Sequence, residues 1–525
     1  MATYSVIIKN GVIFDGTASP LKQADIGIVD DKIKKVGNLQ NDKAPTIIDA
    51  SNKYVSPGFI DITTHSDTHW TLFSQPTQES FIRQGITTII GGHAGSSLAP
   101  LVKAEDIEGI QKWVDVSKIN INWQSMKEFL LELEKHQIGV NFGTFIGFGT
   151  LRRGVIGEQN RPGNKDEISQ MQFLLEKSLK EGGFGVSMNL GAAHQKSAGD
   201  EEIRAVLKTA AASDVIVSHH LADEGKNILP SLARLIEFSR NSGVHFHINH
   251  FKAIGKSAWQ YFPQGLEMME QARKEKARLT CDFFPYTRTG SNLYMLLPDW
   301  ARESGKKHIL SLIKGKERKN ILHYLNELTL HYEKIIVAST LHDLDSKGKS
   351  ILELGQSSGI SPEEIILNLL EVNELQVSIF NEAILEDNIE LLAKRDYSVV
   401  SSDGVGYAGN YRSETDLPHP RSFGAFPRFF SRFVKEKNSL SWENAVHKMT
   451  GFPAKILGIK DRGLIAEGAY ADLVVIEPET IADRADYINP YQFPTGIDYV
   501  LINGAVALKD NFLTGLGKGR VLRHS

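Results

Sequence analysis

The pattern of apolar and polar residues divides the chain into two β-rich ends and a long middle section. Residues 4–55 contain short strand-like runs separated by Gly and Asp-Asp turns, which is typical of antiparallel hairpins. The same texture returns in residues 472–476 and 499–506, and an Asn-Gly pair interrupts a strand at each end of the chain. We therefore expect residues 1–56 and 456–525 to form one small β domain.

In the middle section, apolar strands alternate with amphipathic helices. Asn164 has the side chain of a helix N-cap, residues 168–179 carry an apolar stripe at helical spacing, and two glycines at 182–183 stop the helix. The next apolar run, 184–190, follows at once. This alternation predicts βα units and a mostly parallel sheet.

Eight apolar runs in this section have the character of buried parallel strands. They occupy residues 58–63, 87–92, 139–146, 184–189, 215–219, 244–249, 278–283 and 397–402. Eight is the number that a closed barrel needs, so the sequence predicts an α/β fold with a (β/α)8 TIM barrel over residues 57–455. The stretch from about 290 to 375 is too long for one connection, and we expect an inserted subdomain there, near the barrel mouth.

Five of the eight predicted strands end in residues that bind metals. Their side chains are His65, His93, the pair His219 and His220, His250, and Asp403. The active-site residues of such barrels lie at the carboxyl ends of the strands. Imidazoles together with a carboxylate are suitable ligands for a divalent ion such as zinc. The sequence therefore predicts a hydrolase with one or two metal ions.

Some of these residues have a simpler structural interpretation. His245 and His247 alternate with His250 along one strand, which favours a packing role for both. The adjacent His219 and His220 face opposite ways, so only one of them can enter the site. Asp403 precedes a glycine, and Asp-Gly is also a common turn pair.

Composition narrows the classes of function. A net charge of -4 over 525 residues gives no signature of nucleic-acid binding. The N-terminus lacks a secretory signal pattern, and no apolar stretch approaches the ~18 residues of a membrane helix. We expect a cytoplasmic protein without a membrane partner, and its oligomeric state stays open. Cys281 is the single cysteine, so a metal site must rely mainly on imidazole and carboxylate.

Several longer motifs point to a family. They lie at 57–61, 83–88, 97–100, 402–404, 419–428, 461–464 and 468–475. With them, the chain resembles the D-aminoacylase (N-acyl-D-amino-acid deacylase) branch of the amidohydrolase superfamily over nearly its whole length. The resemblance implies a (β/α)8 barrel, a small β-sandwich built from both termini, and zinc.

The resemblance also implies roles for individual residues. His220 and His250 match metal ligands, and Asp403 matches the aspartate after strand eight. Lys252 and Arg421 match positions that clamp the free carboxylate of the substrate, a task suited to charge-assisted hydrogen bonds. Tyr286 is expected to assist them.

The chain also departs from the family pattern. Thr63 stands where the family has the first histidine of His-x-His, which leaves His65 alone, and Ala94 stands at the position of a metal-binding cysteine. We expect His93 to substitute for that cysteine or only to hydrogen-bond at the mouth, and His65 to support a weak second metal or to position water. We therefore expect one tightly bound zinc ion and a second metal site that is weak or absent.

The pocket departs from the family as well. Phe148 replaces a histidine, Ala222 replaces an arginine, and residues 189–194 do not follow the pattern after strand four. The accepted acyl group and amino acid side chain are therefore open.

Three functions remain at this stage. The first is zinc-dependent removal of the acyl group from a small N-acyl amino acid of D configuration, in which Asp403 takes a proton from metal-activated water and passes it to the leaving nitrogen. The second is hydrolysis of a cyclic amide or another N-acyl compound. The third is a metal-poor pseudoenzyme that acts as a binding protein, motivated by Thr63 and Ala94.

Overall fold

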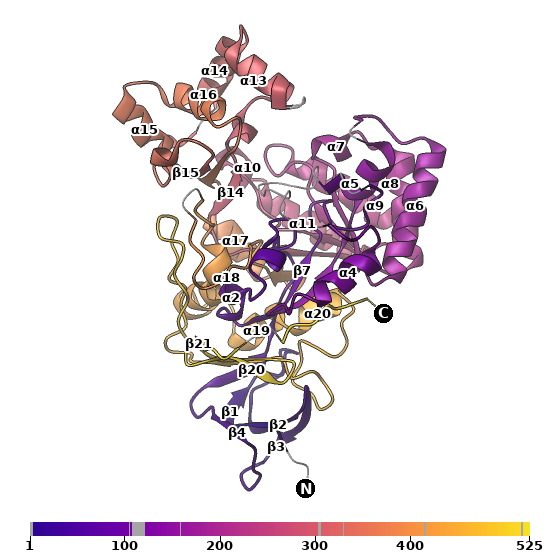
Figure 1. Cartoon of the computed structure of the whole chain (residues 1–525), viewed down its shortest axis with the longest axis vertical. Helices are drawn as coiled ribbons and strands as arrows, with labels where there is room; N and C mark the ends of the chain where they lie inside the picture. Colours follow the sequence, from indigo (N-terminus) through magenta and orange to yellow (C-terminus); the bar gives the residue numbers. More distant parts are fainter. Residues whose placement is uncertain are drawn as a thin grey trace.

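Eight parallel strands form a closed barrel in the middle of the molecule (Figure 1). The computed structural model describes residues 4–103, 106–107, 121–157, 159–302, 306–328, 330–413, 416–515 and 518–524. The barrel strands, in order, are β6 (Phe59–Asp61), β7 (Ile86–Gly91), β8 (Asn141–Thr144) continued by β9 (Ile146–Gly147), β10 (Gly185–Asn189), β11 (Ile216–His220), β12 (Phe246–Ile248), β13 (Leu279–Phe283) and β17 (Ser398–Val400). The last strand returns to the first, since the Asp403 amide donates to the Thr63 carbonyl at 3.0 Å.

The barrel strands are almost entirely buried, because helices cover their outer faces. Helix α6 (Lys165–Lys180) shows how the local sequence produces this arrangement. Asn164 caps it by accepting a hydrogen bond from the Glu167 amide, and Met171 and Leu175 on its inner face are fully buried. The predicted barrel fold, including this helix, is confirmed.

The two ends of the chain pair in one nine-stranded sheet below the barrel (Figure 1). Its strands are β1 (Val6–Ile13), β2 (Lys22–Val29), β3 (Lys32–Gly37), β4 (Thr46–Asp49), β5 (Tyr54–Pro57), β18 (Leu473–Ile476), β19 (Ile497–Ile502), β20 (Ala505–Lys509) and β21 (Phe512–Leu513). The antiparallel pair of β5 and β18 joins the two ends, so the small terminal β domain is confirmed. Simple hairpins do not describe all of it, because β1 pairs in parallel with β4 and β5. The boundaries at 56 and 455 stay a prediction.

The inserted subdomain lies at the far end of the barrel from this sheet (Figure 1). Its core is the antiparallel sheet β14 (Arg288–Asn292), β16 (Val377–Glu382) and β15 (Ile335–Thr340). Its helices are α12 (Asp299–Arg302), α13 (Lys306–Lys314), α14 (Arg318–Glu327), α15 (Ile351–Ser358) and α16 (Pro362–Val372). Its apolar cluster is separate from that of the barrel. The predicted insertion is confirmed, and it extends beyond 290–375 because β14 and β16 pair at its base.

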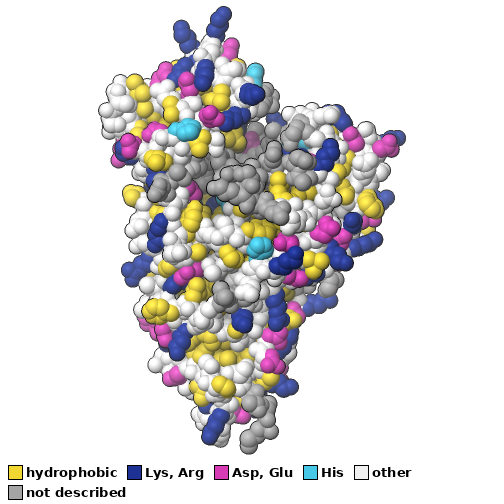
Figure 2. All heavy atoms as spheres, in the orientation of Figure 1, with side chains coloured by type: hydrophobic (Ala, Val, Ile, Leu, Met, Phe, Trp, Pro, Cys, Tyr) yellow, Lys and Arg dark blue, Asp and Glu magenta, His cyan; other side chains and the backbone are white. Residues whose placement is uncertain are grey.

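The other α-helices serve the barrel and its connections. They are α1 (Thr71–Ser74), α2 (Glu79–Ile82), α4 (Met126–Glu134), α5 (Phe148–Ile156), α7 (Ala193–Lys196), α8 (Asp200–Ala212), α9 (Ile228–Ser242), α10 (Lys256–Trp259), α11 (Phe262–Lys274), α17 (Glu386–Ala393), α18 (Arg421–Phe429), α19 (Trp442–Met449) and α20 (Gly451–Ile456). Among the described residues, no helix is both long and apolar enough to cross a membrane. Figure 2 shows lysine and arginine at the outer tip of the insertion and charges of both signs elsewhere on that face.

Candidate metal centre and active site

Two histidines face each other at the carboxyl ends of neighbouring barrel strands. His220 is the last residue of β11, and His250 follows β12 by two residues. The His220 Nδ1 and His250 Nε2 atoms lie 2.9 Å apart, and the ring centroids are 4.5 Å apart. Two nitrogens on one tetrahedral zinc lie about 3.3 Å apart, so this pair is close to the spacing that a single metal ion imposes.

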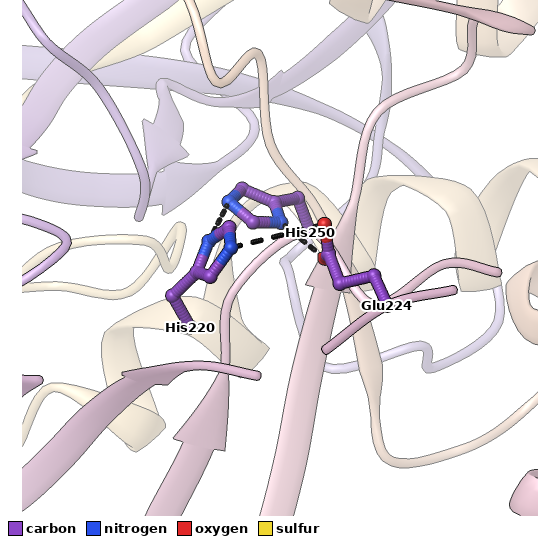
Figure 3. Close-up of side chains that lie close together, drawn as sticks. All are labelled: His220, Glu224 and His250. Carbon is purple, nitrogen blue, oxygen red and sulfur yellow. Dashed lines mark hydrogen bonds and ion pairs between the residues drawn. The ribbon is translucent and has the colours of Figure 1, made fainter. Parts of the chain in front are cut away.

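Glu224 completes this cluster from the loop after β11 (Figure 3). Its Oε1 atom lies 3.2 Å from His250 Nδ1, and its Oε2 atom lies 3.8 Å from His220 Nε2. Each imidazole therefore turns one nitrogen toward the other ring and its second nitrogen toward Glu224. The sequence interpretation assigned Glu224 no role. Its spacing of four residues from His220 is the one signal that could have indicated the contact.

The charges of the cluster fit a divalent cation. Burial lowers the pKa of His220 to about 3, so its imidazole is neutral and has a free lone pair at ordinary pH. Burial alone would raise the pKa of Glu224, but the adjacent Lys252 ammonium outweighs burial and holds it well below its usual range. Imidazole nitrogens beside an ionised carboxylate are ligand types that zinc accepts.

Lys252 is buried behind the same cluster. Its ammonium lies 2.7 Å from Glu224 Oε1 and 2.7 Å from His250 Nδ1. The predicted carboxylate clamp residue Lys252 thus lies beside the candidate metal ligands, with its charge paired to Glu224 in this structure.

Asp403 lies between a cation and an imidazole just after β17. One oxygen is 2.6 Å from Arg421 Nη1, and the other is 2.9 Å from His65 Nε2. Burial opposes ionisation of Asp403, but the Arg421 guanidinium outweighs burial and holds its pKa well below the usual range. Asp403 is therefore an ionised acceptor at neutral pH. Its backbone has φ +49°, in the left-handed region that side chains rarely adopt.

Two buried hydrogen-bond donors near this ion pair have no partner among the described residues. They are the Nε atom of Arg421 and the phenol of Tyr286. The phenol lies against Gly424 in the first turn of α18, the helix that begins at Arg421. Buried donors are rarely left unpaired, so this corner of the site has the chemistry to receive an anion.

The structure does not bring His93 to the histidine pair. Its Nε2 atom donates to the Ile90 carbonyl at 3.1 Å, and its Nδ1 atom lies 3.2 Å from Ser218 Oγ. The chain turns sharply here, since Gly92 and Ala94 both have positive φ, and the turn directs the ring into the barrel. Of the two expectations for His93, hydrogen bonding at the mouth matches this arrangement, and replacement of the cysteine ligand does not.

Thr63 belongs to a buried polar network at the position where the family has a histidine. Its hydroxyl donates to Asp282 Oδ2 at 2.8 Å and accepts from Asn249 Nδ2 at 3.0 Å. His65 is left with Asp403 as its partner and lies outside the metal-ligand cluster. The expected packing residue His247 also belongs to the network, with Nε2 2.9 Å from Asp282 Oδ2.

Comparison with known proteins relates the whole chain to amidohydrolases. A model of the amidohydrolase family matches residues 412–507. A D-aminoacylase of Alcaligenes xylosoxydans xylosoxydans is 28% identical over 519 residues, which cover 99% of this chain and 97% of that protein. An N-acyl-D-glutamate deacylase of the same organism is 26% identical over 95% of this chain and 92% of that protein.

A solved structure shows the same likeness. A crystal structure of D-aminoacylase, described as defining a novel subset of amidohydrolases, superposes with a TM-score of 0.81 and 27% identity, covering 99% of this chain and 100% of that one. These likenesses, together with the histidine and carboxylate cluster, indicate a metal-dependent amidohydrolase. Within the amidohydrolase superfamily, the resemblance to the D-aminoacylase branch is confirmed.

Proposed function

We propose that the protein removes the acyl group from N-acyl amino acids of D configuration and that it uses one zinc ion. The observation that carries the proposal is the facing pair of His220 and His250, backed by Glu224 and adjoined by the ionised Asp403. The D configuration is supported by the relatives, whose names specify D-amino acid substrates. A cytoplasmic location stays a prediction.

His220 Nδ1 and His250 Nε2 would hold the metal. With Nε2 of His250 facing the metal, its Nδ1 atom would lie against the Glu224–Lys252 ion pair, 3.2 Å from Glu224 Oε1 and 2.7 Å from Lys252 Nζ, which fixes the ring. The same carboxylate lies 3.8 Å from Nε2 of His220, so Glu224 is next to both proposed ligands. We do not include His93 among the ligands, because both of its nitrogens have other partners.

A metal bound here supplies an activated water molecule and polarises the amide carbonyl. Asp403 accepts the proton of the attacking water and passes it to the leaving nitrogen, a task that requires an ionised carboxylate. His65 and Arg421 hold Asp403 in place through one oxygen each. Part of the Arg421 guanidinium, including Nε, remains for the substrate.

The substrate carboxylate is received by three cationic or phenolic groups. Arg421 Nε and the Tyr286 hydroxyl are buried and unpaired among the described residues, and Lys252 lies behind His250. Charge-assisted hydrogen bonds from these donors favour a substrate with a free carboxylate over a neutral amide. This preference separates an N-acyl amino acid hydrolase from a cyclic amide hydrolase.

The test is hydrolysis of a panel of N-acetyl D- and L-amino acids, with a hydantoin and a neutral N-alkyl acetamide as controls, and with metal content measured on the same protein. We expect zinc in the protein and cleavage of the D-series. Faster cleavage of the hydantoin would favour the cyclic amide alternative. A protein that holds no metal and cleaves none of these compounds would favour the binding-protein alternative.

A further inference from the structure

Asp282 is a fully buried carboxylate at the carboxyl end of β13, beneath the metal ligands. Its Oδ1 atom accepts hydrogen bonds from the His250 amide at 2.9 Å and from Ser401 Oγ at 2.6 Å. Its Oδ2 atom accepts from Thr63 Oγ1 at 2.8 Å and pairs with His247 Nε2 at 2.9 Å. Asn249 Nδ2 adds a longer contact to Oδ2 at 3.5 Å, so no lone-pair direction of the carboxylate is left free.

These contacts reach four barrel strands at the level where the site is built. Thr63 follows β6, His247 lies in β12, Ser401 follows β17, and Asp282 itself lies in β13. Neighbouring strands in a barrel are joined by backbone bonds, but the residues beyond the strand ends need other partners. The Asp282 side chain is the hydrogen-bond partner of such residues on both sides of the site.

The contact with His250 bears directly on the metal ligand. His250 has φ +36°, a conformation that is strained for a residue with a side chain and persists only where surrounding contacts hold it. Asp282 provides two such contacts, because its side chain accepts from the His250 amide and its own carbonyl accepts from the Phe251 amide at 2.8 Å.

A second branch of the network leads to Asp403. Ser401 lies two residues before Asp403, and its hydroxyl donates to Asp282. The Asp403 amide donates to the carbonyl of Thr63, and the Thr63 hydroxyl in turn donates to Asp282. The backbone of Asp403 has positive φ as well. The strained turn on each side of the site is thus connected to the same carboxylate.

We propose that Asp282 is a positioning residue that fixes the strained turns carrying His250 and Asp403 and thereby sets the geometry of the metal site. It acts through the backbone of these residues and contacts neither substrate nor metal. The inference rests on the proposed function only in taking His250 as a metal ligand, and it does not depend on which N-acyl compound is cleaved.

The test compares three variants. Asp282→Ala removes the carboxylate, Asp282→Asn keeps one oxygen to accept from the His250 amide, and Thr280→Val is the matched control. Thr280 lies two residues earlier in β13, and its hydroxyl bonds His245 and His247 in the same buried network without contacting His250. Each folded variant is titrated with zinc against a chromophoric chelator, and the visible spectrum of its cobalt(II) form is recorded.

We expect Asp282→Ala to weaken zinc binding about 10- to 100-fold and to change the cobalt spectrum, as loss of an outer partner of a metal ligand does. Asp282→Asn should recover part of the affinity, and Thr280→Val should lower thermal stability while leaving zinc affinity and spectrum as in the wild type. If Asp282→Ala does not fold, the Asp282→Asn variant tests the inference instead. The inference then requires Asp282→Asn to bind zinc more weakly than Thr280→Val does.

Equal zinc affinities and cobalt spectra for the Asp282 variants and Thr280→Val would overturn the inference. A wild-type protein that binds zinc through His250 but cleaves no N-acyl amino acid would overturn the proposed substrate and leave the role of Asp282 standing. A wild-type protein without metal affinity would overturn both.

Discussion

Asp403 shows how a residue that could be an ordinary turn aspartate acquires a chemical role. Its position before a glycine is equally compatible with a turn, but the structure surrounds it with Arg421 and His65 and buries it. The Arg421 cation keeps it ionised in spite of burial. An ionised carboxylate beside the two imidazoles proposed to bind the metal can accept the proton of water.

Replacing Asp403 by asparagine tests this role. Asp403→Asn keeps the size of the side chain and removes its ability to take a proton. Hydrolysis of the N-acyl amino acid should fall by about 10²- to 10⁴-fold, the usual contribution of a general base. Zinc content should stay near that of the wild type, because the two histidines are untouched. Unchanged turnover would remove Asp403 from the mechanism.

Replacing Lys252 or Arg421 tests the recognition of a carboxylate. Lys252→Ala and Arg421→Ala should raise KM for N-acyl amino acids far more than for neutral amides, because the lost hydrogen bonds are made only to the free carboxylate. Arg421→Ala should also lower kcat, since Arg421 holds Asp403. Arg412→Ala, at an exposed arginine in the loop before α18, is the control. Equal effects on charged and neutral substrates would contradict the assignment.

Glu224 is the residue that the sequence interpretation missed. Glu224→Gln keeps the shape of the side chain but removes the negative charge beside both imidazoles, so zinc affinity should fall about 10- to 100-fold. A chelator competition assay measures this. Glu176→Gln, the same substitution at an exposed residue of α6 away from the site, is the control. Wild-type zinc affinity in Glu224→Gln would show that the carboxylate does not orient the ligands.

At the scale of elements, the sequence predicted what depends on local patterns. The capped helix α6 follows from Asn164 and an apolar stripe that lie within one segment, and the barrel strands follow from apolar runs of the right length. The parallel pairing of β1 with β4 was not predicted, because register between distant segments leaves no local signal. The direction of His93 was left open between two alternatives, because it depends on positive φ at Ala94, where the sequence has no glycine.

Packing of α19 against β17 gives an element-level prediction. Lys448 in α19 is buried, donates to the Ser398 carbonyl at 2.9 Å, and has its pKa lowered by burial from 10.5 to about 8. Between pH 8 and 10.5 the unfolded chain holds a proton at this residue and the folded chain does not, so this group makes stability rise with pH. In denaturant unfolding at several pH values, Lys448→Met should lose this contribution relative to the wild type. Parallel pH profiles would contradict the assignment.

At the scale of the whole molecule, the C-terminal segment runs along the base of the barrel and is hydrogen-bonded to it. The Phe142 amide donates to the Arg520 carbonyl at 2.9 Å, the Leu522 amide donates to the Phe142 carbonyl at 2.7 Å, and the His524 amide donates to the Gly182 carbonyl at 3.1 Å. These contacts lie at the amino ends of β8 and β10. The segment therefore supports the barrel on the side away from the metal ligands.

A chain that ends at residue 518 should unfold at a lower temperature than the full chain, because it loses these backbone bonds, each worth about 1 kcal/mol. Its zinc affinity should be unchanged. Arg523→Ala, which removes only the ion pair with Glu134, should have a smaller effect, since exposed ion pairs contribute little. Loss of zinc binding without loss of thermal stability would contradict this separation of roles.

The central claim is that one metal ion at His220 and His250 makes this chain an N-acyl amino acid hydrolase. The most direct measurement is hydrolysis of N-acetyl-D-amino acids by metal-stripped protein as zinc is added. The account predicts negligible activity at the start and a rise that ends at one zinc per chain, with His250→Ala inactive at the same zinc concentration. Full activity of the metal-stripped protein, or zinc binding without any hydrolysis, would contradict it.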